Sequence, residues 1–90
     1  MPENSVDHEE NNENLASYKY ILGEMGIQIL IAISRGASNK VSIRLISGVP
    51  LECINGRLPV LSNLNLIRQN QEEYHITDRG NSFLITLENE

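Results

Sequence analysis

The sequence predicts an α+β fold with a three-helix core, a two-stranded β-hairpin and a C-terminal helix. Residues 43–67, IRLISGVPLECINGRLPVLSNLNLI, contain two helix-like apolar stretches separated by a glycine and followed directly by a strand-like run. Residues 74–80, YHITDRG, read as a strand that ends at a helix cap. Two helices joined by a tight Gly turn form a helix-turn-helix, and a hairpin after them makes the fold winged.

The first helix is expected over residues 15–34. Its apolar side chains recur every three or four residues, which is the spacing of one buried helical face: Tyr18, Leu22, Met25, Ile29 and Ile33, widened by Ile21 and Leu30. Gly23 and Gly26 weaken this helix. They indicate a close approach of another helix, a looser first turn, or nothing structural, and the sequence leaves these alternatives open.

The second helix is expected from Lys40 to Ser47, with Ser38 or Asn39 as its N-cap. Gly36 suits the left-handed residue that ends the preceding helix. The side chains expected to face inward on this second helix are Val41, Leu45 and Ile46. After it, Gly48 makes the turn and Val49 fixes the turn to the core.

The third helix is expected from Pro50 to Asn63, since proline suits a first helical turn. Its predicted buried stripe is Ile54, Leu58, Leu61 and Leu64. Its predicted outward residues are Glu52, Cys53, Asn55, Gly56, Arg57, Pro59 and Val60. Pro59 removes one backbone hydrogen bond inside the helix, so we expect a kink there.

A hairpin and a last helix complete the predicted domain. The two strands are residues 66–69 and 73–77, and the polar loop is 70–72. Asp78 or Thr77 caps a helix that runs to Leu87 and packs through Phe83, Leu84 and Leu87. We expect Arg79 to pair with Asp78 or Glu72.

Charge is divided unevenly along the 90 residues, whose net charge is −5. Residues 1–17 hold five acidic side chains and no Lys or Arg, whereas residues 18–87 hold all seven cations and five acids. Residues 1–14 are therefore expected to form a disordered acidic tail, and residues 15–90 the folded domain. The tail either keeps the protein in solution or screens the weakly basic body from DNA.

The run from Ser42 to Leu87 resembles the winged helix-turn-helix domains of small archaeal and bacterial transcription regulators. The matching stretches are IRLISGVP, LECINGRLPVLSNLNLI and YHITDRGNSFL, the last carrying a Tyr-x-hydrophobic-Thr-x-x-Gly-x-x-hydrophobic signature. The resemblance implies binding to double-stranded DNA and often a homodimer. This chain differs from the pattern in its recognition helix, which presents Glu52, Gly56, Pro59 and Val60, and in its acidic hairpin tip, residues 70–73.

Seven residues are candidates for DNA contact: Lys40, Arg44, Glu52, Asn55, Arg57, Arg68 and Gln69. Arg57 and Asn55 have side chains that suit guanine and adenine edges, respectively. Lys40 and Arg44 suit phosphates, which position a protein on DNA without reading its sequence. Each of these residues is equally consistent with an ordinary solvated surface position.

The sequence offers little support for other classes of function. One cysteine gives no internal disulfide and no Cys-based metal site, and Cys53 fits a half-buried apolar position. His75 alternates with Tyr74 and Ile76, so it should point away from the core. With no catalytic constellation, cofactor motif, secretory signal or membrane-length apolar run, we expect a cytoplasmic, nucleoid-associated protein that is not an enzyme.

The alternative interpretation is a winged-helix adaptor that binds protein and little or no DNA. Its basis is the apolar Val60, Pro59 and the acidic hairpin tip. In the DNA-binding interpretation, the helix at 50–63 enters the major groove and dimerisation uses the first or last helix.

Overall fold

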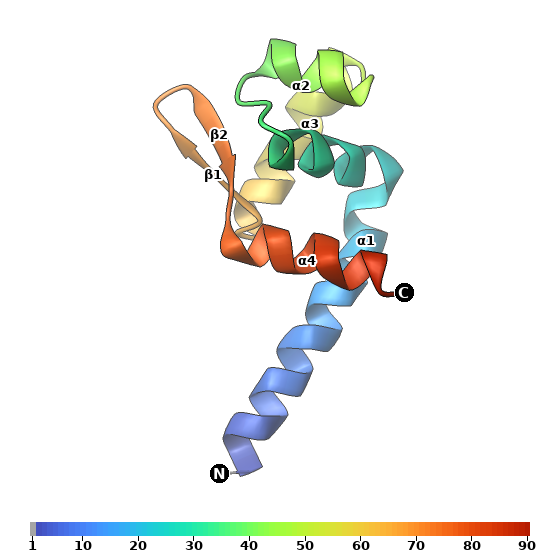
Figure 1. Cartoon of the computed structure of the whole chain (residues 1–90), viewed down its shortest axis with the longest axis vertical. Coiled ribbons are helices and arrows are strands. Elements are labelled where there is room, and N and C mark those ends of the chain that lie inside the picture. Colours follow the sequence, from blue (N-terminus) through green and yellow to red (C-terminus); the bar gives the residue numbers. More distant parts are fainter. Residues whose placement is uncertain (1) are drawn as a thin grey trace.

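A computed structural model describes residues 2–90, with side chains from Leu15 onward, and its element order is that of the predicted fold (Figure 1). The elements are α1 (Pro2–Ser34), α2 (Lys40–Ser47), α3 (Leu51–Asn63), β1 (Ile67–Asn70), β2 (Glu73–Ile76) and α4 (Asp78–Glu88). The prediction of a disordered acidic tail concerns residues whose side chains lie outside this description, and it stays a prediction.

Helix α1 is central to the packing, because it contacts α2, α3, α4 and β2. Gly23 interrupts it with φ 68° and ψ −179°, a backbone conformation outside the helical region, and the ribbon changes direction there (Figure 1). The break shifts the phase of the apolar stripe. Leu22, Ile29, Leu30 and Ile33 are buried, as expected, whereas Ile21 and Met25 were wrongly assigned to the buried face and are exposed.

Gly26 allows the close approach that was one of the alternatives for the two glycines of α1. A Cβ built on Gly26 would lie 2.9 Å from Leu22 Cβ and 3.7 Å from Arg57 Cδ of α3. The stem of Arg57 therefore lies against α1 at the one position in that turn where no side chain is present.

Local chemistry fixes both ends of α2 as the sequence predicts. Asn39 is the N-cap: its Oδ1 accepts from the Ser42 amide at 2.8 Å, and Ser42 Oγ accepts from the Asn39 amide at 3.1 Å. Gly48 ends the helix in the left-handed conformation with φ 75°. Val49 is buried, so it fixes the turn to the core as predicted.

The predicted inward face of α2 is wrong. Ile43 is its fully buried side chain, whereas Val41, Leu45 and Ile46 are 68%, 77% and 49% exposed. The helix has only eight residues, so only about one turn of it packs against the core. Ile43 is the side chain that makes this contact.

Helix α3 buries Ile54, Leu58 and Leu61, as predicted, and continues through Pro59 to Asn63. Pro50 serves as its N-cap residue rather than its first helical residue. Val60 was wrongly placed on the outside, because it is half-buried and packs against the core.

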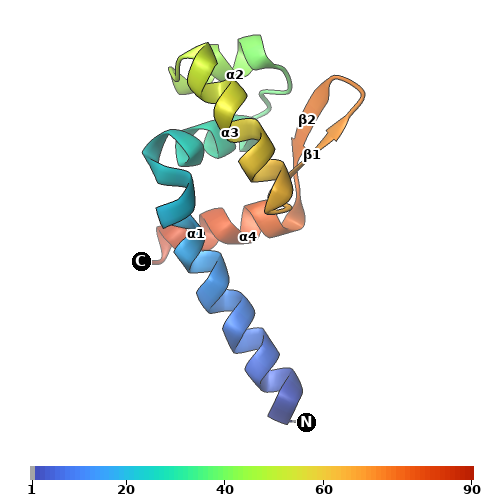
Figure 2. The ribbon, with the colours of Figure 1, turned by 180° about the vertical axis from the view of Figure 1, so that it is seen from behind.

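The two strands form an antiparallel hairpin, which we call the wing (β1, β2 and the Gln71–Glu72 turn). Ile67 pairs with Ile76, Arg68 with His75, Gln69 with Tyr74 and Asn70 with Glu73. The Tyr74 amide donates to the Ser38 carbonyl at 2.8 Å. This bond ties the wing to the loop that leads into α2, and both views show the wing and α2 extending toward the same end of the molecule (Figures 1 and 2).

Thr77, one of the two predicted caps, is the N-cap of helix α4. Its Oγ1 accepts from the Gly80 amide at 3.0 Å and donates to the Asn65 carbonyl at 2.6 Å. Phe83 is fully buried, with Leu84 and Leu87 packed around the core as predicted. The predicted partners of Arg79 are wrong: its Nη2 donates to the Tyr18 hydroxyl at 2.6 Å and its Nε to the Leu64 carbonyl at 3.2 Å.

We expect Gly80→Ala to destabilise the protein by about 3 kcal/mol, because an added methyl group would overpack this junction. A Cβ on Gly80 would collide with the Leu66 carbonyl oxygen and lie 2.6 Å from Ile76 Cγ1. Denaturant unfolding followed by circular dichroism measures the loss. Gly56→Ala is the matched control: nothing lies within 4 Å of its Cβ, so that variant should be as stable as the parent or more so. Equal stability of the Gly80→Ala variant and the parent would contradict the close contact.

Candidate nucleic-acid interface

A hollow lies between the start of α2, the flank of α3 and the wing, and we call it the wing cleft. It consists of two adjoining spaces of about 340 and 300 Å³ that share Lys40, Gln69 and Tyr74. The other residues that line it are Asn39, Val41, Asn55, Leu58, Pro59, Ser62, Asn63 and Glu72. The polar part of the lining therefore combines amides, hydroxyls, one ammonium and one carboxylate, and Val41, Leu58 and Pro59 supply apolar surface.

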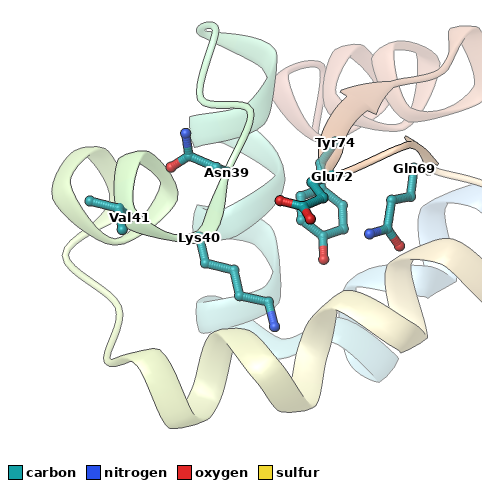
Figure 3. A pocket seen from close by; sticks show the side chains of 6 residues that line it. All are labelled: Asn39, Lys40, Val41, Gln69, Glu72 and Tyr74. Carbon is teal, nitrogen blue, oxygen red and sulfur yellow. The ribbon is translucent and has the colours of Figure 1, made fainter.

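Lys40 is the cation of the cleft. The cap on Asn39 sets the direction of the first turn of α2, and Lys40 points from that turn into the space facing α3 and the wing (Figure 3). Glu72 and Tyr74 face the same space from the wing, while Val41 points away from Lys40 (Figure 3). Lys40 thus has an exposed ammonium in a position to meet an anion, with the carboxylate of Glu72 on the opposite wall.

The candidate residues of α3 are spread around the helix. Successive residues turn by about 100°, so Glu52, Gly56 and Asn63 lie nearly opposite the buried Ile54. Asn55 turns toward the wing cleft, whereas Arg57 turns to the other flank, against Gly26 of α1. The outermost face of α3 therefore carries a carboxylate and an amide and no cation.

The remaining candidates border the cleft. Arg44 is exposed one helical turn beyond Lys40, on the same side of α2. Gln69 lines the cleft, and Arg68 points to the other face of the wing beside its register partner His75. His75 is exposed, as predicted, with its Nε2 3.4 Å from Glu73 Oε1.

The structure thus gathers Lys40, Asn55 and Gln69 at one place, with Arg44 beside them, and it separates them from Arg57 and Arg68. Ser62, Asn63 and Tyr74 also line the cleft and were not among the predicted contacts. The spacing of Asn55, Pro59 and Ser62 on one helical side is the sequence signal that would have pointed to Ser62. Tyr74 gave no such signal, because its ring is a core residue.

Two other kinds of site find no support in the part of the chain that the structure describes. Within that part of the chain, no group of three or more His, Cys, Asp or Glu side chains is placed to hold a metal ion. No helix among the described residues is both long and apolar enough to cross a membrane.

Comparison with known proteins agrees with this architecture. A family model described as winged helix-turn-helix matches residues 23–90, which include all of α2, α3, the wing and α4. The chain belongs to the winged helix-turn-helix family. Within this domain α2 and α3 form the helix-turn-helix and the β1–β2 hairpin is the wing. No curated protein and no solved structure matches the chain.

We expect Asn39→Ala to cost about 1 kcal/mol of unfolding free energy, because it removes the side-chain half of the α2 cap. Asn39→Ser is the matched control, since serine caps helices equally well. Thermal unfolding of the three proteins measures the difference. Loss of stability in both variants would show that the Asn39 amide matters for some reason other than capping.

Proposed function

We propose that this winged helix-turn-helix protein binds double-stranded DNA through the wing cleft and α3, and that it is a small transcription regulator. The observation that carries the proposal is the convergence of Lys40, Asn55 and Gln69 on one cleft beside the recognition helix. Family membership supports DNA as the ligand. The proposal includes no catalytic step.

In the proposed complex, α3 enters the major groove and the start of α2 meets the phosphate backbone. Lys40 and Arg44 form a row along α2 that can neutralise neighbouring phosphates. Asn55, Asn63 and Gln69 offer amide groups, which can pair with the donor and acceptor pattern of adenine. Association with DNA would place the protein with the nucleoid, and binding as a homodimer would suit two half-sites about one helical turn apart.

The electrostatics of the interface favour moderate affinity. Glu72 faces Lys40 in the cleft, and Glu52 lies on the outer face of α3. Each carboxylate repels phosphate, and Glu72 also partly cancels the charge of Lys40. The amide-rich lining consequently bears more of the binding than it would in a strongly basic domain.

The second candidate function is a protein-binding adaptor with little or no DNA binding. The specific observation in its favour is the outer face of α3, where Glu52, Gly56 and Asn63 provide no positive charge. Val60 no longer supports it, because that side chain packs on the core. Failure of the chain to bind any duplex at low salt would decide for the adaptor.

The first test of DNA binding is a salt titration on random duplex DNA by fluorescence anisotropy. The log–log slope should be near −0.9 per phosphate neutralised. We expect Lys40→Ala to weaken binding about fivefold and to make that slope shallower by about one. Arg57→Ala, on the flank that faces α1, should change affinity by less than about twofold. The reverse order of effects would mean that DNA docks against the α1 flank of α3.

A variant that should strengthen DNA binding tests the same interface by removing a negative charge. Because Glu72 faces the proposed phosphate path, Glu72→Gln should strengthen duplex binding by about threefold at low salt. Glu88→Gln on α4 removes the same charge far from the cleft and serves as the matched control. If both variants bind equally better, net charge explains the gain and the cleft does not.

A further inference from the structure

Helix α2 exposes two large apolar side chains to solvent. Val41 is 68% exposed and Leu45 is 77% exposed, and they lie four residues apart on one side of the helix. We call this pair the α2 ridge. Ile46 and Leu51, which flank the turn to α3, are also exposed, at 49% and 42%. Single exposed apolar residues are ordinary, but several on one short segment mark an interaction surface.

The charge beside the ridge indicates what covers it. Lys40 and Arg44 form a second row four residues apart, adjacent to Val41 and Leu45, and the α2 sequence KVSIRLIS contains no acidic residue. A surface with one apolar row and one basic row is complementary to a helix with an apolar row and an acidic row. We propose that the α2 ridge is a docking surface for an acidic amphipathic helix of a partner protein.

A second copy of this chain fits the ridge poorly. In a two-fold symmetric contact the same patch meets itself, so each copy would bring the basic row of Lys40 and Arg44 to the other copy's identical patch. Since α2 has no acidic side chain, α2 itself offers no group that offsets the repulsion between these like charges. The charge pattern therefore favours a different protein over a ridge-to-ridge dimer.

The chain's own acidic tail is also a poor occupant. Residues 1–14 supply five acidic side chains, but Val6 is almost their only apolar one. Such a segment can neutralise Lys40 and Arg44 without covering Val41 and Leu45. Because the ridge is defined by its apolar side chains, its partner must bring apolar groups as well as acids.

The ridge can be tested separately from the wing cleft at Leu45. Val41 borders the cleft, although its side chain points away from Lys40 (Figure 3), whereas Leu45, one turn further along the same side, lines neither of the two spaces. A substitution at Leu45 should thus change the ridge and leave the cleft intact. The inference does not depend on DNA binding.

The test uses the full chain and two synthetic helical peptides. One peptide carries Leu in an i, i+4 row flanked by Glu, and the other has Lys at every Glu position. By fluorescence anisotropy at low salt, the acidic peptide should bind and the basic peptide should not. Leu45→Ser should weaken the acidic peptide's binding about tenfold, as expected for loss of a central apolar contact. Ile85→Ser, at an α4 side chain that is 57% exposed, is the matched control and should bind like the parent.

Thermal unfolding of both variants shows whether they remain folded, which the exposure of both side chains leads us to expect. The proposal is overturned if neither peptide binds, if both bind equally, or if Leu45→Ser and Ile85→Ser have the same effect. It is also overturned if the parent chain dimerises in sedimentation equilibrium and Leu45→Ser abolishes the dimer, because the occupant is then a second copy.

Discussion

The contact between Thr77–Gly80 and the segment Asn65–Leu66 holds the recognition helix, the wing and α4 in one arrangement. The Leu66 carbonyl accepts from the Thr77 amide at 3.0 Å and lies where a Cβ on Gly80 would collide with it, while Thr77 Oγ1 donates to the Asn65 carbonyl. The residue before β1 and the residue after β2 are therefore bonded to each other at the base of the wing. Backbone hydrogen bonds hold the wing at its base, through Thr77 and Leu66, and also join it to Ser38 through Tyr74. These bonds fix the position of the wing wall of the cleft.

The sequence predicted the elements well where their boundaries depend on local chemistry. Asn39, Gly48 and Thr77 act within a few residues of themselves, so a cap or a left-handed turn is visible in the sequence. The sequence failed where burial depends on distant packing. In α2, both the Ile43 side and the Val41–Leu45 side are apolar, and only the position of α1 decides which one is covered. In α1, the break at Gly23 changes the helical phase, and periodicity alone does not detect such a break.

For the candidate site too, the sequence predicted some residues, and the placement of the others depends on tertiary packing. Lys40, Asn55 and Gln69 were predicted from side-chain type and from their place in the fold, and the wing cleft brings them together. The sequence did not show that Arg57 turns toward Gly26 of α1, because that requires knowing which flank of α3 each neighbour occupies. Ser62 follows Asn55 and Pro59 on one side of α3, whereas Tyr74 joins the cleft through tertiary contacts that no local pattern marks.

The two rows of α2 have different physical consequences for recognition. A lysine or arginine beside a phosphate contributes long-range attraction that salt weakens, whereas an apolar side chain contributes only after contact and is largely insensitive to salt. Lys40 and Arg44 can therefore serve the nucleic-acid side and the protein side of α2, but Val41 and Leu45 can serve only a protein. In these two proposals the eight-residue α2, which buries only Ile43, connects two binding surfaces.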